Sequence, residues 1–327
     1  MTRYDTKLAR IKAGNYRRGD FIIADAKDGD MGPSIRSCGP KLGKDGTFTH
    51  YRTRAEFLDQ VRAVIAQDVV DILLASASSL EILNETGAFD GTSVKSAFRA
   101  NDATDIWVGR GASYAKQPSR PYRTASIEAS RRQSDLGLYS ITFNNDLDAD
   151  YESQLAFLDF VDEASDHEFQ YFLEVFNPNV ETGIDPEQLP YYINDCICRA
   201  LAGLTRAQRP QFLKIAYNGP KALEELASYD PDLVVGVLGG GAGTARDTFE
   251  LIHQAEKYGA RIALFGRKIN LAEDPLAMVK LMRAVADGEV SPLEAVKAYH
   301  GTLQASGQTP LRSIEDDSKI TEKVLMG

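Results

Sequence analysis

Two charged side chains interrupt short apolar segments of this sequence. Lys214 lies within Gln211–Ala216, and Glu174 lies within Phe169–Phe176. Because side chains alternate between the two faces of a β-strand, each charge points away from the face that its apolar neighbours use. A lysine whose ammonium is disfavoured by burial can add to a carbonyl group and form a Schiff base. A buried carboxyl group can act as a general acid or base.

Each of these residues also has a structural interpretation. Lys214 could end its strand and reach solvent or pair with an acid, and Glu174 could neutralise a buried cation. Neighbouring parallel strands lie about 4.8 Å apart, so the two inward-pointing heads would come within reach of each other. We therefore expect either an ion pair or a nucleophile beside the group that handles its proton.

Two glycine-containing segments could form plain turns, but their position after the last two predicted strands favours a site for a phosphate group. One follows the apolar segment Leu233–Leu238 and the other follows Arg261–Phe265. Glycines let backbone N–H groups approach an anion closely, and a helix N-terminus favours negative charge. The candidate binding residues are Gly239, Gly240, Gly241, Gly266 and Arg267.

The elements that would position these residues follow a regular order. Eight β-rich apolar segments alternate with amphipathic helical stretches such as Arg54–Gln67, Tyr151–Ala164 and Thr244–Tyr258, which predicts an α/β fold, a (β/α)₈ TIM barrel. The strand segments are Phe21–Ala26, Val69–Ala75, Thr104–Val108, Leu138–Phe143, Phe169–Phe176, Gln211–Ala216, Leu233–Leu238 and Arg261–Phe265. A doubly wound open sheet is the alternative. No GxGxxG motif follows a first strand, which argues against a dinucleotide-binding fold.

Polar segments after the predicted strands supply further candidates. Asp28, at the end of the first strand, could relay protons or simply form a turn. The long segments Gly29–Thr53 and Arg110–Gln133 follow strands, and in a barrel such loops build the active-site face. Arg110 is therefore a candidate for binding a ligand anion. The block Arg99–Asp102 precedes the predicted third strand, so we expect it near the opposite, non-catalytic end.

Length and composition limit the class of protein. The chain has 327 residues, 43% of them hydrophobic, and a net charge of −10. It holds enough apolar residues for a core, and its charge argues against nucleic acid or an anionic membrane as a partner. We expect one TIM-barrel domain over residues 1–327, with an N-terminal extension (1–20) and a peripheral C-terminal tail or packing arm (308–327).

The sequence offers little support for metal binding or secretion. The four histidines show no ligand spacing, and Cys196 and Cys198 are too close together for the usual zinc pair. The first twenty residues lack the apolar core of a signal peptide, and no apolar run is long enough to span a bilayer. We expect a cytoplasmic protein without a metal or cofactor.

Taken in order, these motifs resemble class I aldolases of the (β/α)₈ superfamily, especially the archaeal-type fructose-bisphosphate and the tagatose-bisphosphate aldolases. Phe212–Ile215 resembles the strand-six segment that carries the Schiff-base lysine. Ala263–Ile269, with the preceding glycine run, is similar to the phosphate-binding ends of strands seven and eight. Phe172–Glu174 resembles the strand-five acid of the tagatose branch, and Ala26–Gly29 the acidic end of strand one.

Two positions depart from these families. The tagatose branch carries a lysine on strand four, where this sequence reads Ser140–Asn145. The archaeal branch uses a tyrosine for proton transfer near strand five, and Tyr171 is the candidate in that region.

The resemblance implies a metal-independent carbon–carbon lyase acting on a phosphorylated ketose or related sugar. Lys214 would form an iminium that serves as the electron sink, and Glu174 or Asp28 would transfer protons. Backbone groups around Gly240, with Arg267, would hold the phosphate. The resemblance also implies a homo-oligomer. Two alternatives stay open: another enzyme on this scaffold, transaldolase-like or an isomerase, and a non-catalytic phosphosugar sensor in which Lys214 only pairs with Glu174.

Overall fold

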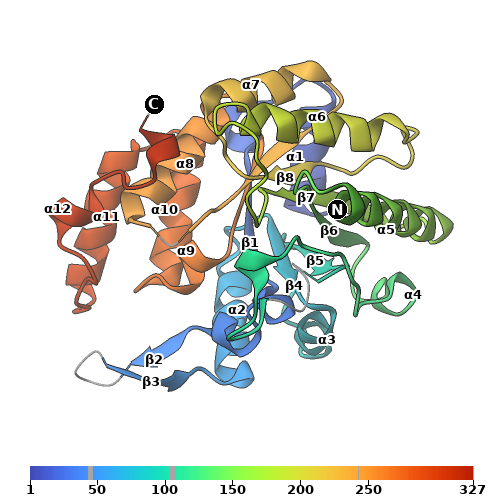
Figure 1. Cartoon of the computed structure of the whole chain (residues 1–327). Coiled ribbons are helices and arrows are strands. Elements are labelled where there is room, and N and C mark those ends of the chain that lie inside the picture. The colour runs from blue at the N-terminus through green and yellow to red at the C-terminus, as the bar shows by residue number, and fades with distance from the viewer. Residues whose placement is uncertain (43–46, 103–107, 242, 327) are drawn as a thin grey trace.

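The chain forms the (β/α)₈ barrel that the sequence predicts (Figure 1). The computed structural model describes residues 1–42, 47–102, 108–241 and 243–326. Within these residues, eight parallel strands close in the order β1, β10, β9, β8, β7, β6, β5, β4. The strands are β1 Ile22–Lys27, β4 Ile72–Ala75, β5 Lys95–Arg99, β6 Leu136–Thr142, β7 Gln170–Phe176, β8 Leu213–Ile215, β9 Val235–Leu238 and β10 Ile262–Phe265.

The predicted third strand is wrong. The third strand of the barrel is β5, Lys95–Arg99, which lies upstream of the predicted segment Thr104–Val108. Residues 103–107 lie outside the described residues, and Val108 belongs to no barrel strand. Charged residues at both ends of β5 hide its apolar centre from a search for hydrophobic runs. The correction moves Arg99 to the carboxyl end of a strand, the end where barrel active sites form.

Helices surround the barrel, and their starts follow ordinary capping chemistry. The predicted helix Arg54–Gln67 is α2, which begins with a capping box between Thr53 and Glu56. The helices are α1 Arg3–Lys12, α2 Arg54–Gln67, α3 Ala77–Glu85, α4 Ile127–Ser130, α5 Leu147–Asp166, α6 Leu189–Ala202, α7 Pro220–Tyr229, α8 Ala245–Lys257, α9 Arg267–Asn270, α10 Pro275–Asp287, α11 Pro292–Ala305 and α12 Ile314–Asp317. No described helix is long and apolar enough to cross a membrane.

Alternating side chains divide the core into two layers. One layer fills the barrel and includes Ile22, Leu138, Phe172 and Phe212. The other layer lies between the strands and the helices and contains their sequence neighbours, for example Leu213. The face assignment made from sequence for β7 and β8 is therefore confirmed, and the charged residues of these strands follow Phe172 and Phe212 on the inner face.

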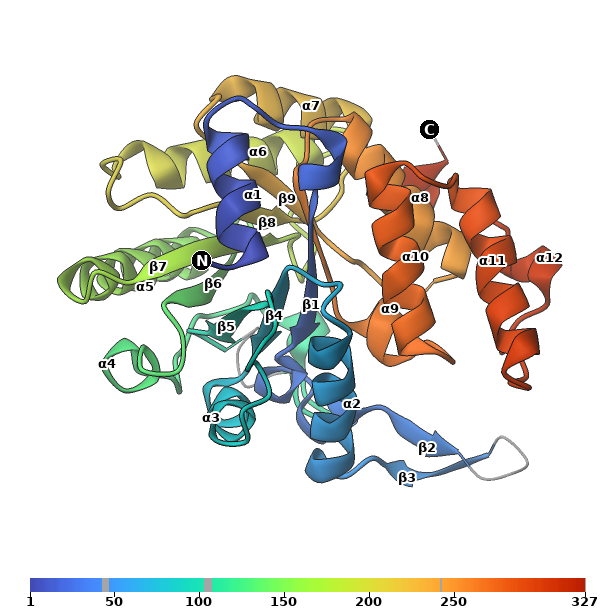
Figure 2. The same ribbon diagram turned by 180° about the vertical axis from the view of Figure 1, so that it is seen from behind.

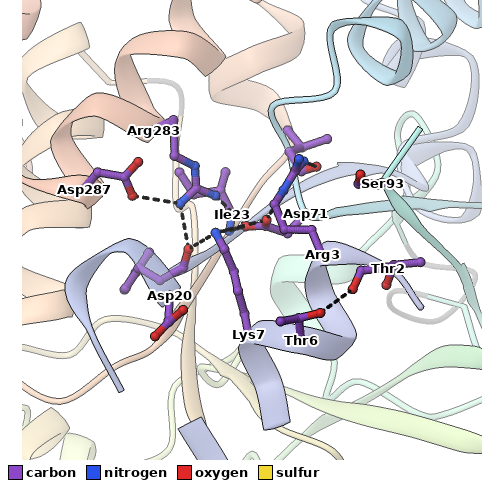
Figure 3. Close-up of polar contacts among 12 residues, drawn as sticks. Thr2, Arg3, Thr6, Lys7, Asp20, Ile23, Asp71, Ser93, Arg283 and Asp287 are labelled. Carbon is purple, nitrogen blue, oxygen red and sulfur yellow. Dashed lines mark hydrogen bonds and ion pairs between the residues drawn. The ribbon is translucent and has the colours of Figure 1, made fainter. Parts of the chain in front are cut away.

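Helix α1 closes the amino end of the barrel (Figure 2). Its Tyr4 belongs to the apolar cluster inside the barrel. Beside it, the fully buried carboxylate of Asp71 receives Arg3 Nε at 2.7 Å, Lys7 Nζ at 3.1 Å and the guanidinium of Arg283 (Figure 3). This cluster, the Asp71 cluster, links α1 and α10 to the residue that directly precedes β4.

The segment between β1 and α2 carries a projecting hairpin. Strands β2 (Pro40–Leu42) and β3 (Phe48–Tyr51) pair antiparallel and extend away from the barrel (Figure 1). The part of the segment before the hairpin stays over the carboxyl end of the barrel, where Gly32, Arg36 and Ser37 line a cavity. Gly109 and Tyr114, in the long loop that follows β5, line the same cavity. Both loops therefore lie on the predicted active-site face.

Candidate active site

Four polar side chains share one layer inside the carboxyl end of the barrel. They come from four consecutive strands: Arg99 from β5, Ser140 from β6, Glu174 from β7 and Lys214 from β8. Ser140 is the register partner of Glu174, and Glu174 is the register partner of Lys214. All four are buried. They occupy inward-facing positions of their strands, and the inward-facing positions deeper in the barrel carry apolar side chains. We call these four residues the Glu174 cluster.

Lys214 and Glu174 are in direct contact. Lys214 Nζ lies 2.6 Å from Glu174 Oε1. Burial alone would raise the pKa of Glu174, but the ammonium of Lys214 and the guanidinium of Arg99 lower it to about 2. The carboxylate is therefore ionised at neutral pH and positioned to exchange a proton with the amine. The proximity expected from strand alternation is present.

Arg99 also belongs to the site, although the sequence predicts it near the opposite end of the barrel. Its guanidinium donates to Glu174 Oε2 at 2.9 Å and to Ser140 Oγ at 2.6 Å, and it also contacts Asp28. Ser140 Oγ in turn donates to Glu174 Oε2 at 2.7 Å. A cation from the third strand thus lies against Ser140 of the fourth strand. The sequence does contain the relevant feature, a positive charge at the end of a short strand. Because the third strand is predicted at Thr104–Val108, that charge is assigned to the wrong end of the barrel.

Asp28 lies where the sequence predicts it, just after β1 at the carboxyl end of the barrel. It is 7% exposed, lines the cavity and is tied to Arg99 rather than to Lys214. A second pair lies on β1 itself, where Lys27 Nζ is 3.2 Å from Asp25 Oδ1. Burial raises the pKa of Asp25 to about 6, and the charge of Lys27 opposes that rise.

A cavity of about 820 Å³ opens above the Glu174 cluster. Its walls include Lys214, Glu174 and Arg99 from the barrel and Tyr114 from the loop after β5. This volume falls within the range of pockets that bind small molecules. The buried charges of the cluster are therefore accessible to a ligand of that size.

The predicted phosphate residues divide into two groups. Gly239, Gly240, Gly266 and Arg267 line the cavity, and Arg267 donates from its guanidinium to the carbonyl oxygen of Gly240 at 3.1 Å. The other two predicted residues, Gly241 and Arg110, are exposed and do not line this cavity. The carboxyl ends of β9 and β10 therefore bring part of the candidate anion site beside Lys214.

Tyr171 does not reach the cavity. It packs edge-on against Phe157 and Phe160 in the layer between strands and helices, and its hydroxyl donates to the carbonyl oxygen of Gln208 at 2.8 Å. In this chain, the groups of β7 and β8 that lie next to each other in the cavity are Glu174 and Lys214. Among the described residues, no group of three or more His, Cys, Asp or Glu side chains is arranged to hold a metal ion.

Comparison with known proteins supports the fold. No protein-family model matches the chain, and no curated protein matches it in sequence. Its structure is similar to an archaeal fructose-1,6-bisphosphate aldolase whose catalytic lysine is covalently bound to the carbinolamine intermediate of the substrate. The TM-score is 0.64 and the identity 14%, over 87% of this chain and 99% of the other.

Two further structures are similar over comparable lengths. One is a Schiff-base-forming fructose-1,6-bisphosphate aldolase, with a TM-score of 0.62 and 16% identity over 87% of this chain and 98% of that one. The other is Cgl0159 from Corynebacterium glutamicum, with a TM-score of 0.59 and 16% identity over 88% and 94%. At these identities the likeness establishes the (β/α)₈ barrel fold and leaves the activity open.

Proposed function

We propose that this protein is a Schiff-base-forming class I aldolase that cleaves a carbon–carbon bond in a phosphorylated ketose or a related sugar. The observation that carries the proposal is a buried lysine that lines a cavity large enough for a sugar phosphate and contacts a carboxylate at 2.6 Å. The similarity in fold to aldolases that form such an intermediate supports it.

In this reaction Lys214 Nζ adds to the ketose carbonyl carbon, and loss of water leaves an iminium. Glu174 Oε1, 2.6 Å from Nζ, accepts the proton that the ammonium must lose before it can attack, and it returns this proton to the carbinolamine hydroxyl as water leaves, which regenerates the carboxylate. A carboxylate, Glu174 or Asp28, then takes the proton of the C4 hydroxyl as the C3–C4 bond breaks. The electrons of that bond move to the iminium and give an enamine, and an aldehyde leaves.

Arg99 and Ser140 keep the proton acceptor, Glu174, ionised and fix its orientation. Both donate to Oε2 of Glu174, which leaves Oε1 directed at Lys214. Backbone groups of Gly239 and Gly240, with Arg267, bind the phosphate of the substrate in this proposal, because they line the same cavity at the ends of β9 and β10.

Reductive trapping tests the proposal. Wild-type protein and Lys214→Ala are incubated with dihydroxyacetone phosphate and borohydride, and intact mass is measured. We expect one covalent adduct on the wild type and none on the variant. Absence of an adduct on the wild type with several ketose phosphates would overturn the class I assignment.

A phosphosugar sensor is the second candidate, and one observation favours it. Glu174 is held ionised between two cations, an arrangement that also suits a permanent ion pair with Lys214. A sensor would bind the sugar phosphate and give no adduct. Trapping without retro-aldol turnover would instead indicate another Schiff-base enzyme, such as a transaldolase-like one.

A further inference from the structure

The end of the chain packs against the loop proposed to bind phosphate. Residues 313–326, the C-terminal arm, follow α11 and cross the start of α8 (Figure 1). Asp317 Oδ1 accepts the backbone N–H of Ala245 at 2.8 Å, and Thr244 Oγ1 donates to the carbonyl oxygen of Lys319 at 2.7 Å. The first residues of α8 therefore bond to the arm. They directly follow the glycine loop, defined here as residues 239–241 and 243.

A second carboxylate fixes the arm more firmly. Asp247 is fully buried, and its Oδ1 accepts the backbone N–H groups of Thr321 at 2.7 Å and of Glu322 at 3.2 Å. Its Oδ2 accepts the hydroxyl of Thr321 at 2.6 Å and the backbone N–H of Thr244 at 2.9 Å. Leu325 anchors the following turn in the apolar core. The position of Glu322 is thus set by hydrogen bonds to the buried carboxylate of Asp247 and by the buried side chain of Leu325.

The side chain of Glu322 meets the rear of the glycine loop. Its Oε1 lies 3.1 Å from Lys268 Nζ, and the Lys268 side chain is 1% exposed. A Cβ atom added to Gly240 would lie 3.4 Å from Glu322 Oε2, and one added to Gly243 would lie 3.2 Å from Oε1. Gly240 also lines the cavity. At this point a single backbone segment separates Glu322 from the cavity.

We propose that Glu322 is a positioning residue for phosphate recognition and that the C-terminal arm braces the glycine loop from behind. This inference rests on the proposed function, because it assigns the loop a phosphate ligand. Glycines at positive φ, here Gly240 at 64° and Gly243 at 50°, have wide conformational freedom in an unsupported loop. The Glu322 carboxylate occupies the space directly behind both glycines, which restricts that freedom before the ligand arrives.

The charges are consistent with a brace. The negative charge of Glu322 is balanced by Lys268, so the pair presents little net charge to a phosphate on the other side of the loop. From the cavity side, Arg267 holds the carbonyl oxygen of Gly240. Gly240 is therefore bonded to Arg267 on the cavity side and backed by Glu322 on the other, and the loop loses less conformational entropy when it binds an anion.

The test measures two ligands on three full-length variants. Glycerol 3-phosphate, which has no carbonyl and cannot form a Schiff base, reports on the loop by calorimetry. Dihydroxyacetone, which has no phosphate, reports on Lys214 by borohydride trapping. The variants are Glu322→Gln, the milder Thr321→Val, and the control Glu315→Gln, which makes the same substitution at an exposed position of the arm. Thermal unfolding verifies that each variant is folded.

We expect Glu322→Gln to weaken glycerol 3-phosphate binding about tenfold through lost preorganisation. Thr321→Val should weaken it less, Glu315→Gln should not change it, and dihydroxyacetone trapping should be the same in all. Unchanged affinity in Glu322→Gln would overturn the brace, and tighter binding would show that Glu322 competes with the ligand. If the wild type binds no glycerol 3-phosphate, the brace fails, while trapping of dihydroxyacetone still reports whether Lys214 forms a Schiff base.

Discussion

The barrel carries a buried ionic cluster at each end, and the two clusters differ in what they face. In the Asp71 cluster, one carboxylate receives Arg3, Lys7 and Arg283 (Figure 3). In the Glu174 cluster, one carboxylate receives Arg99 and Lys214. Burial would raise the pKa of both carboxyls, but the adjacent cations hold both pKa values below the ordinary range.

Access to a cavity separates the two clusters. Lys214, Glu174 and Arg99 line the 820 Å³ cavity, whereas none of the Asp71 cluster residues lines it. Asp71 also accepts the backbone N–H of Ile23 at 2.8 Å, which ties it to the sheet. A buried lysine–carboxylate pair is therefore not in itself a sign of catalysis. We assign stability to the Asp71 cluster and chemistry to the Glu174 cluster, in line with the usual division between the two ends of such barrels.

The largest effect should come from Lys214→Ala. Loss of the nucleophile should lower retro-aldol turnover of a ketose phosphate at least about a thousandfold, as for other catalytic nucleophiles. The fold should persist, because Glu174 keeps Arg99 and Ser140 as partners. Steady-state kinetics with thermal unfolding measures both properties. Residual activity within tenfold of the wild type would contradict the role of Lys214.

Asp71→Asn should produce the reverse pattern. Removing the charge that three cations share should lower the free energy of unfolding by about 3–5 kcal/mol. The kcat of the folded fraction should stay near that of the wild type. Urea unfolding monitors stability. Asp287→Asn is the control, because Asp287 Oδ1 lies 3.3 Å from the guanidinium of Arg283 at the edge of the cluster and a change below about 1 kcal/mol is expected there. A kcat loss in Asp71→Asn without a stability loss would erase the distinction between the clusters.

Arg99→Lys should have a smaller effect, on turnover. An ammonium cannot contact Asp28, Ser140 and Glu174 at once as the planar guanidinium does. Loss of one charge-assisted hydrogen bond is worth about 1.5–3 kcal/mol, so kcat should fall roughly 10- to 100-fold. The amount of trapped adduct at saturating substrate should not change. Unaltered kcat would mean that Arg99 only neutralises charge.

The smallest effect is expected in the pH dependence of the free energy of unfolding. The pKa of Glu174 is lowered from 4.5 to about 2, so the unfolded chain binds more protons in this range than the folded protein does. The stabilising contribution of Glu174 is present above pH 4.5 and is lost as the pH falls toward 2. Urea unfolding between pH 3 and 7 should therefore show a weaker acid dependence for Glu174→Gln than for the wild type. Equal slopes would contradict an ionised Glu174.

The sequence predicts this molecule well where a charge interrupts an apolar strand. Lys214 and Glu174 could be placed on the inner face because their neighbours are apolar on both sides. Arg99 could not, because β5 has a lysine at one end, an arginine at the other and few apolar residues between them. Its contacts with Asp28 and Ser140 depend on the closure of the barrel, which no local pattern encodes.

The two ends of the chain were likewise beyond local patterns. Helix α1 supplies Arg3 and Lys7 to the Asp71 cluster, and Glu322 reaches Lys268 from the C-terminal arm. The apolar stripe Tyr4, Leu8 and Ile11 indicates that α1 packs on the barrel, but no periodicity indicates that the charged residues Arg3, Lys7 and Glu322 reach buried partners. Their contacts join residues far apart in the chain, and only the folded structure shows them.

Locating the adduct tests the account most directly. After borohydride trapping with dihydroxyacetone phosphate, the protein is digested and the modified lysine is identified by tandem mass spectrometry. Lys7, Lys27, Lys214 and Lys268 are all buried, so burial alone does not single out one of them. We expect modification at Lys214 alone. Modification at Lys7 or Lys27, or none at Lys214, would contradict the assignment of chemistry to the Glu174 cluster.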